Sequence, residues 1–434
     1  MLFVKKLHFS FLLLLPFFFS CKKDKDTEAP DITINTPYEN QFYSVFDVIN
    51  VTASVSDNKQ LTEVSVNLLN ADQVPAYLTF PINVSSPSAS VNFAYALDDI
   101  HLEGGMYYLH IFATDGENDA HAYQKIYIAA VPKVLKKLVV TTASSSSQTN
   151  VSLVDSTFSA LSFYHTFSGD YIGSYASSYY QKIYNCGEYT GHFSGIKLED
   201  HSVSFDISPF ISAVPYFTGM YSSEKVNYIS RYDEVLKGYD HTGAVVYNAQ
   251  SMPGYFIKKC ILNDNNIIAE EQEKVSGVKK LVAFYPSGVA MQNSSLNQDV
   301  VAFCEKNSSS VFVFGNSAGQ GKIQLYDRIN NNLWDPYPFS LDPGMITSAV
   351  KIDEDTYLIG HSNGTIYKYK YTSSSLTPYL TGYNAIQLLY EELSNQVYVV
   401  QTGSITSFYY PSATLVNTVS SAETILKMNF LYNR

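Results

Sequence analysis

The segment GNSAGQGK, from Gly315 to Lys322, contains residues whose types and spacing could perform chemistry. Its first five residues satisfy G-x-S-x-G, the pattern of a sharp strand-to-helix turn that exposes a nucleophilic serine. The segment also comes within one residue of the glycine-rich loop that cradles phosphate. Both motifs require a helix directly after the loop. The residues that follow, QGKIQLYD, alternate as a strand does, so we predict that Ser317 lies in a hairpin bend and is not a nucleophile.

A repeat along the chain supports this interpretation. GKIQLY from Gly321 recurs as GTIYKY from Gly364 and GSITSF from Gly403, each after an apolar strand, and weaker copies precede them. The apolar anchors of the seven copies lie 39 to 45 residues apart: Val151, Ile196, Leu236, Leu281, Ile323, Ile366 and Ile405. This period predicts four-stranded blades of a β-propeller.

The repeated motif is similar to the third strand of WD40 and quinoprotein-type propellers, in which G-x-I-x-x-Y-D recurs. The chain departs from those families because Trp334 is its only tryptophan. The first copy lacks an inner strand, and the last run, ETILKMNFLYNR, has no second strand after it. We therefore expect residues 133–434 to form a seven-bladed β-propeller, closed by the C-terminal strand as the inner strand of the first blade.

Residues 30–132 alternate apolar and polar with a period of two in about seven short runs, which predicts a two-sheet β-sandwich. The segments VTASVSDNKQLTEVSV and GGMYYLHIFATDGEN resemble strands of bacterial immunoglobulin-like domains. In cadherin-like relatives, acids placed like Asp57, Asp115, Glu117 and Asp119 bind calcium. Such acids also occur on solvated turns, so we assign no metal site. With no amphipathic helix visible after the N-terminus, the fold class is all-β.

The N-terminus has the layout of a secretory signal over residues 1–20, with Lys5 and Lys6 ahead of an apolar run that is short for a membrane span. FFSC, ending at Cys21, resembles the lipobox of bacterial lipoproteins, which implies that Cys21 is acylated. Residues 21–29 form a charged tether, and in Gram-negative lipoproteins such a run resembles an outer-membrane signal. We expect a lipid-anchored protein of the outer membrane, on the cell surface or the periplasmic side.

The charge and the cysteines exclude other classes of function. The net charge is −12, and removing residues 1–20 with their two lysines gives 26 − 40 = −14, which argues against nucleic acid as a partner. Cys186, Cys260 and Cys304 show no disulfide or zinc spacing and are expected to be buried thiols. Cys260 and Cys304 each lie seven residues before a second strand, which predicts equivalent inner-strand positions. No cofactor is expected.

Candidate binding residues lie in the loops expected between second and third strands, on one face of the propeller. The two longest loops are residues 185–195 and 270–277, and a shorter one spans 315–321. The candidates are Glu188, Tyr189, His192, Glu270, Glu271 and Asn316. Adjacent carboxylates on a strand point to opposite faces, so Glu270 and Glu271 are poor candidates for the acid pair of a glycosidase, and we assign no catalytic residue.

The sequence therefore predicts an envelope lipoprotein that acts as a non-catalytic binding or scaffold module, engaging a protein or glycan partner through the propeller face. The alternative is a propeller enzyme, a glycosidase or lyase, acting on extracellular polysaccharide. A third possibility is a subunit that only organises its neighbours in an envelope assembly. Fold alone does not choose among them.

Overall fold

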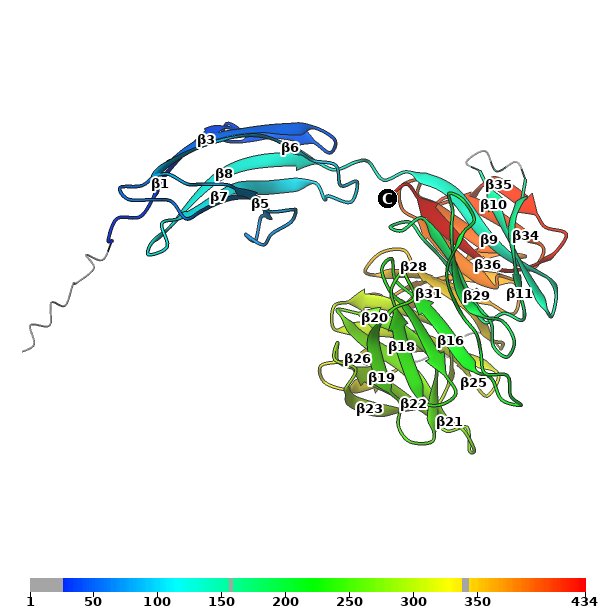
Figure 1. The fold of residues 1–434 in the computed structure, drawn as a ribbon. Helices are drawn as coiled ribbons and strands as arrows, with labels where there is room; N and C mark the ends of the chain where they lie inside the picture. Colours follow the sequence, from blue (N-terminus) through cyan, green and yellow to red (C-terminus); the bar gives the residue numbers. More distant parts are fainter. Residues whose placement is uncertain (1–25, 156–157, 159, 338–342) are drawn as a thin grey trace, which may run out of the picture. The chain divides into compact units, whose positions relative to one another are not determined.

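The computed structural model describes residues 26–155, 158, 160–337 and 343–434, and it divides the chain into two compact units that meet between Pro132 and Lys133 (Figure 1). Every regular element in the described residues is a β-strand, which confirms the all-β prediction. None of the described residues forms a helix long and apolar enough to cross a membrane. The predicted signal segment and Cys21 lie outside the described residues.

From residue 26 to residue 132, the first unit contains two sheets. One has the order β1 (Asp31–Thr36), β3 (Val48–Ser56), β6 (Ser88–Ala96). The other has the order β2 (Gln41–Ser44), β8 (Asp119–Ala129), β7 (Gly105–Thr114), β4 (Glu63–Asn70), β5 (Phe80–Ile82). Alternate residues of β3 are buried, and Val51 packs in one core with Val64 and Leu109 of the other sheet. The period-two pattern of the sequence thus marks the faces that the two sheets turn toward each other.

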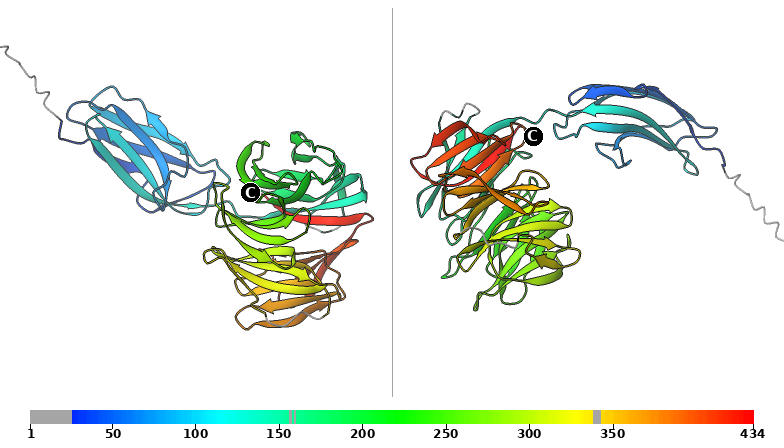
Figure 2. Two further views of the ribbon diagram at one scale, coloured as in Figure 1. Left: turned by 90° about the horizontal axis from the view of Figure 1, so that it is seen from below. Right: turned by 180° about the vertical axis from the view of Figure 1, so that it is seen from behind.

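The described residues of the second unit form seven four-stranded sheets, numbered here in chain order (Figures 1 and 2). Sheet 1 is β36 (Thr424–Tyr432), β9 (Leu135–Ser145), β10 (Gln148–Val154), β11 (Ser162–Ser168); sheet 2 is β12 (Gly173–Ser177), β13 (Lys182–Cys186), β14 (Phe193–Lys197), β15 (Val203–Ile207). Sheet 3 is β16 (Phe217–Ser222), β17 (Asn227–Arg231), β18 (Val235–Tyr239), β19 (Val245–Gln250); sheet 4 is β20 (Tyr255–Asn263), β21 (Asn266–Glu273), β22 (Lys279–Phe284), β23 (Ala290–Leu296). Sheet 5 is β24 (Asp299–Asn307), β25 (Ser310–Ser317), β26 (Gln320–Asp327), β27 (Asn332–Trp334); sheet 6 is β28 (Ile346–Lys351), β29 (Thr356–His361), β30 (Thr365–Lys370), β31 (Ser375–Thr381). Sheet 7 is β32 (Gln387–Glu391), β33 (Gln396–Val400), β34 (Ser404–Tyr409), β35 (Thr414–Ser420).

The third strand of every sheet carries the apolar anchor that the repeat predicted. All seven anchors are buried, with side chains at most 3% exposed: Val151, Ile196, Leu236, Leu281, Ile323, Ile366 and Ile405. Each lies in a cluster of apolar side chains, as Ile323 does with Phe314 and Tyr357 of two neighbouring sheets. The repeat is therefore a packing unit, because each anchor helps to fill the space between adjacent sheets.

Strand β36 joins the two ends of the second unit. It pairs antiparallel with β9, so that Met428 lies opposite Val140, and in Figure 1 the red C-terminal strand lies beside the cyan-green β9. The sequence predicted this pairing from the two incomplete copies at the ends of the repeat. It gives β9 a hydrogen-bonded neighbour on each side, since β10 occupies its other edge.

Ser317 ends β25 and lies opposite Gln320, the first residue of β26. The two residues between them, Ala318 and Gly319, have positive φ of 51° and 79°, as the tight turn of a two-residue hairpin requires. No helix follows, so the hairpin prediction is confirmed and the nucleophilic serine turn is excluded.

We expect Gly319→Ala to lower the free energy of unfolding by about 1 kcal/mol, because a Cβ disfavours positive φ. Ser317→Ala should change it by less than about 0.5 kcal/mol. Urea unfolding of both variants measures this difference. An ester hydrolysis activity that is present in the wild type and lost in Ser317→Ala would contradict the hairpin interpretation.

The prediction that Cys260 and Cys304 occupy equivalent inner-strand positions is wrong: their positions in the strand pairing differ by one residue. Cys260 packs with Tyr228 and Leu236 of sheet 3, whereas Cys304 packs with Tyr357 of sheet 6. The two cysteines therefore point to opposite faces of their sheets. A bulge in β24, between Glu305 and Asn307, shifts the register, and spacing along the chain cannot reveal a bulge.

Candidate functional site

The loop that joins β13 to β14 is folded around one carboxylate. The backbone N–H groups of Glu188, Tyr189, Thr190 and Gly191 all donate to Asp170, at 3.1, 2.8, 3.0 and 2.7 Å. Burial acts to raise the pKa of Asp170, but these hydrogen bonds outweigh it and lower the pKa below its usual value. Asp170 thus fixes the path of the loop on which three of the six candidates lie.

Close backbone packing makes this loop rigid. A Cβ on Gly187 would lie 2.3 Å from the Cα of Gly191, and a Cβ on Gly191 would lie 2.4 Å from the carbonyl oxygen of Asp170. No side chain fits at such distances without moving the backbone. The loop therefore presents its side chains from a preorganised conformation, which lowers the entropy cost of binding a partner.

We expect Asp170→Ala to loosen this loop, at a cost on the order of 2 kcal/mol, because several N–H groups lose a charged acceptor. Hydrogen exchange should become faster at residues 188–191, while the rest of sheet 2 keeps its protection. Asp200→Ala is the matched control, since its carboxylate accepts the N–H of Ser202 in an exposed turn. Unchanged exchange in Asp170→Ala would show that the packing of the glycines alone holds the loop.

Glu188, Tyr189 and His192 lie on this loop, where the sequence predicted them. Tyr189 is 38% exposed, and His192 Nδ1 lies 2.7 Å from an Asp206 carboxylate oxygen. The carbonyl oxygen of Glu188 accepts the N–H of Tyr216 at 2.9 Å, which joins the loop to sheet 3. Burial, together with the nearby Asp170 carboxylate, raises the pKa of Glu188.

Beside this loop, on sheets 3 and 4, lie two tyrosines that have cations over their rings. The guanidinium of Arg231 lies 4.9 Å from the ring centre of Tyr216, and the amine of Lys274 lies 5.1 Å from that of Tyr232. Tyr232 donates its N–H to the carbonyl oxygen of Tyr216, which places the two tyrosines side by side. We call Tyr189, Tyr216, Arg231, Tyr232 and Lys274 the tyrosine–cation surface.

Ion pairs hold both cations of this surface in place. Arg231 pairs with Asp233, and Lys274 Nζ lies 2.7 Å from Glu234 Oε1. The same Glu234 oxygen accepts the N–H of Gly254 at 3.0 Å, which links the loop of sheet 3 to the start of sheet 4. Arginine and tyrosine contribute large shares of binding energy in protein interfaces, and held side chains lose little entropy on binding.

The prediction that Glu270 and Glu271 belong to an exposed loop is wrong. Both lie within β21, and their side chains are 1% and 0% exposed. Glu270 Oε1 accepts the N–H of Val300 at 3.4 Å, and Glu271 Oε2 accepts that of Met252 at 3.3 Å. Burial raises the pKa of both, that of Glu271 to about 7. A run of charges resembles a loop in sequence, but here the neighbouring sheets cover the strand.

Asn316 is also engaged within the fold. Its side-chain amide donates to the carbonyl oxygen of Ile346 at 2.9 Å and accepts the N–H of the same residue at 2.8 Å. The amide thereby ties β25 of sheet 5 to β28 of sheet 6. These two bonds hold the side chain in place, and the predicted binding role of Asn316 stays a prediction.

Asp170, Tyr216 and Lys274 belong to this site, although sequence reasoning did not single them out. Asp170 lies in the link from β11 to β12, 18 to 21 residues before the N–H groups that it binds. The sequence feature that could have indicated an anion at this loop is the pair Gly187 and Gly191 in CGEYTG, because glycines allow backbone N–H groups to converge on an anion. Tyr216 and Lys274 gave no signal beyond their residue types.

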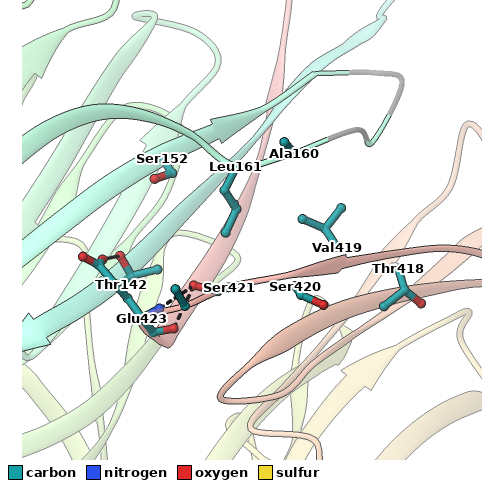
Figure 3. A pocket seen from close by; sticks show the side chains of 10 residues that line it. Thr142, Ser152, Ala160, Leu161, Thr418, Val419, Ser420, Ser421 and Glu423 are labelled. Carbon is teal, nitrogen blue, oxygen red and sulfur yellow. Dashed lines mark hydrogen bonds between the residues drawn. The ribbon is translucent and has the colours of Figure 1, made fainter.

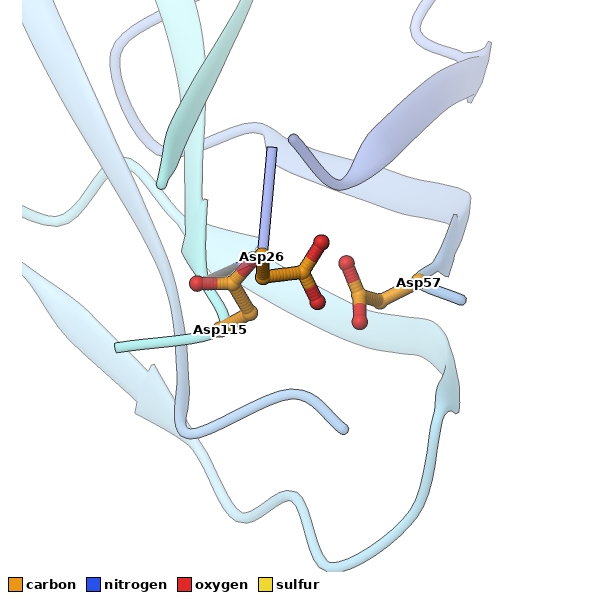
Figure 4. A group of neighbouring side chains, drawn as sticks. All are labelled: Asp26, Asp57 and Asp115. Carbon is orange, nitrogen blue, oxygen red and sulfur yellow. The ribbon is translucent and has the colours of Figure 1, made fainter. Parts of the chain in front are cut away.

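The first unit gathers three carboxylates. Asp26, Asp57 and Asp115 offer oxygens within 4.8 Å of one another (Figure 4). The calcium-type set considered from the sequence shares Asp57 and Asp115, whereas Glu117 accepts the N–H of Asp26 at 2.6 Å. Lys59 Nζ lies 3.2 Å from Asp26, so an ammonium group already balances part of the charge that a cation would meet. These three oxygen ligands are suited to a hard cation.

A cavity of about 490 Å³ lies where sheet 7 meets sheet 1 (Figure 3). The carboxylate of Glu423 accepts hydrogen bonds from Thr142 and from Asn150, the latter at 2.8 Å, and the carbonyl oxygen of Glu423 accepts the Ser421 hydroxyl at 2.8 Å. These bonds fasten the link between β35 and β36 to sheet 1. The polar centre of the cavity therefore serves the closure of the second unit.

The strand order of the second unit defines a β-propeller protein. No family model matches the sequence, and no curated protein matches it. Among solved structures, the chain is similar to a quinoprotein alcohol dehydrogenase-like protein from Bacteroides thetaiotaomicron, at 12% identity over 94% of this chain and 99% of that one, with a TM-score of 0.46. It is also similar to a chain of a mitotic checkpoint complex (9% identity, 59% and 79% coverage, TM-score 0.47) and to the computationally designed protein Ika8 (12%, 68% and 91%, 0.46). The propeller assignment rests on the chain's own strand order.

Proposed function

We propose that this chain is a lipid-anchored protein of the bacterial cell envelope, with an immunoglobulin-like spacer and a seven-bladed propeller that binds a partner without catalysis. The observation that supports it best is the tyrosine–cation surface beside a loop fixed by Asp170. Aromatic rings and an arginine on held backbone favour a protein as the partner over a glycan. The negative net charge makes nucleic acid an unsuitable partner.

A pull-down from envelope extract tests the proposal, using the soluble chain from Thr27 onward, with a glycan array in parallel. We expect Tyr216→Ala combined with Arg231→Ala to lower partner capture at least about tenfold. The matched control is Tyr285→Ala, because Tyr285 is 46% exposed and lies at the opposite end of the strands, between β22 and β23. Cleavage of a polysaccharide by the purified chain would favour the enzyme alternative and overturn the proposal.

The membrane anchor can be tested separately. If Cys21 is acylated, the wild-type chain should fractionate with membranes and the Cys21→Ser variant should not. This N-terminus resembles that of bacterial lipoproteins. Those proteins carry several acyl chains on the corresponding cysteine, which is enough for stable anchoring. A wild-type chain whose mature N-terminus is unmodified by mass spectrometry would refute lipidation, without bearing on the binding surface.

A further inference from the structure

A second concave site lies between sheets 1 and 2, apart from the tyrosine–cation surface. It is a groove of about 330 Å³, lined on one side by β11 and on the other by the start of β14 and by β15. The residues that bear on its chemistry are His165, Phe167, His192, Ser194, Val203 and Asp206. Its volume is at the small end of the range for ligand pockets, about 300–1,000 Å³, and suits one or two sugar-sized units.

The strand register explains why these side chains face the groove together. His192, Ser194 and Ile196 are alternate residues, so they lie on one face of sheet 2. Ser194 pairs across the ladder with Asp206, and Ile196 pairs with Val203. Cross-strand partners project to the same side of a sheet. The groove therefore has a polar end, around Ser194 and Asp206, and an apolar end, around Ile196 and Val203.

The polar end offers hydrogen-bonding groups of both kinds. His192 Nδ1 lies 2.7 Å from Asp206 Oδ2, so in the neutral imidazole Nδ1 carries the proton and Nε2 is left as an acceptor. The side chains of His192 and Asp206 are 43% and 47% exposed, and the second carboxylate oxygen can accept a ligand hydroxyl. The Ser194 hydroxyl can donate or accept.

The opposite wall is neutral and partly apolar. Burial, reinforced by the nearby His201, lowers the pKa of His165, so this imidazole is uncharged at neutral pH. Its ring packs edge-on against Phe167, with ring centres 4.7 Å apart. Val203 is 61% exposed and extends the apolar surface to the rim. The residues that line the groove include no lysine or arginine, and their one carboxylate, Asp206, is already paired with the His192 imidazole. The groove therefore offers an ionised ligand no unpaired opposite charge.

We propose that this groove binds a neutral sugar unit of a glycan. A pyranose ring has an apolar face that would cover Val203 and the ring of His165, behind which Phe167 is buried, and hydroxyls at its edge that would bond to Asp206, Ser194 and His192. A carboxylate accepting two hydroxyl protons binds a polyol more strongly than neutral acceptors do. This goes beyond the proposed function, since it assigns a second ligand to a site that the protein partner does not occupy.

Saturation-transfer NMR with the chain from Thr27 onward tests this proposal. The probes are the methyl glycosides of glucose, galactose, mannose and N-acetylglucosamine, at about 10 mM because single sugar units bind weakly. Sodium glucuronate is the charged probe of the same ring size, and a glycan array covers longer neutral oligosaccharides. We expect at least one neutral sugar to bind, and Asp206→Ala and His192→Ala to weaken it about tenfold.

Three further variants keep the result interpretable. Val203→Glu places a second carboxylate at the exposed rim and should also abolish binding without disturbing the core. His241→Ala is the matched control, because His241 stacks on Tyr180 at 4.0 Å, outside the groove, and should bind sugar like the wild type. Tyr216→Ala should leave sugar binding intact, which separates this site from the tyrosine–cation surface.

The proposal is overturned if no neutral sugar binds on the array or by NMR, if only glucuronate binds, or if sugar binding survives in all three groove variants. A loss of protein capture in Tyr216→Ala with sugar binding retained supports two separate sites. If only the protein pull-down fails, this inference still holds, because it is tested by the binding of sugar and not by the capture of a protein.

Discussion

A chain that ends at Glu423 should fail to fold its second unit. The deletion removes β36, the strand that pairs with β9, and with it five buried residues, of which Ile425, Met428 and Leu431 are the least exposed, at 1%, 0% and 3%. Truncating one such side chain to alanine costs about 2–5 kcal/mol, so losing all three with their ladder rivals the whole stability of a domain, about 5–15 kcal/mol. The deletion also leaves an edge of β9 open to aggregation.

Circular dichroism and size-exclusion chromatography measure this outcome. The first unit should still melt cooperatively, because its core contains no residue beyond position 131. A synthetic peptide of residues 423–434 should restore the second transition, since it supplies the missing ladder. Thr424→Ala is the matched control, because its side chain is exposed. A truncated chain with an unchanged second transition would show that ring closure is dispensable.

Replacing Glu271 by glutamine should change how stability depends on pH. Burial raises the pKa of Glu271 to about 7 from 4.5, although the Met252 N–H and Ser251 act to lower it. Between these pH values the folded chain keeps a proton that the unfolded chain releases. The carboxyl therefore makes the wild type less stable as pH rises through this window, by about 1.4 kcal/mol per pH unit and on the order of 3 kcal/mol in total.

Glutamine does not titrate, so the stability of Glu271→Gln relative to the wild type should increase from pH 5 to pH 7. Glu270, whose pKa is also raised by burial, is present in both chains and cancels in the difference. Urea unfolding at several pH values measures the difference, and Glu199→Gln, at an exposed position, is the control. Parallel curves for the variant and the wild type would mean that Glu271 is ionised in the folded chain.

Features built from neighbouring residues were predictable from the sequence. The anchors Ile323, Ile366 and Ile405 repeat because each blade is specified by its own alternation and turn residues. Gly319 follows Ala318 at a two-residue turn for the same local reason. The end strand β36 could be paired with β9 because two incomplete copies complement each other. Each of these inferences depended only on the residue pattern within short segments of the chain, and not on contacts between sheets.

The candidate site was predictable only in part. Glu188, Tyr189 and His192 were correctly placed on a loop, because a long loop between strands is a local feature. Glu270 and Glu271 were misplaced because their burial comes from sheets 3 and 5, which no local pattern reports. The register of Cys304 was missed because a bulge leaves no signature in spacing.

The sequence by itself determined the repeat and the order of the strands within each sheet of the second unit, since period-two patterning and turn residues act within a few positions. The tertiary structure alone decided which charges are buried, which loop Asp170 holds, and that His192 faces a groove with Asp206. These outcomes depend on contacts between sheets, where burial and the convergence of several hydrogen bonds on one atom set the energy.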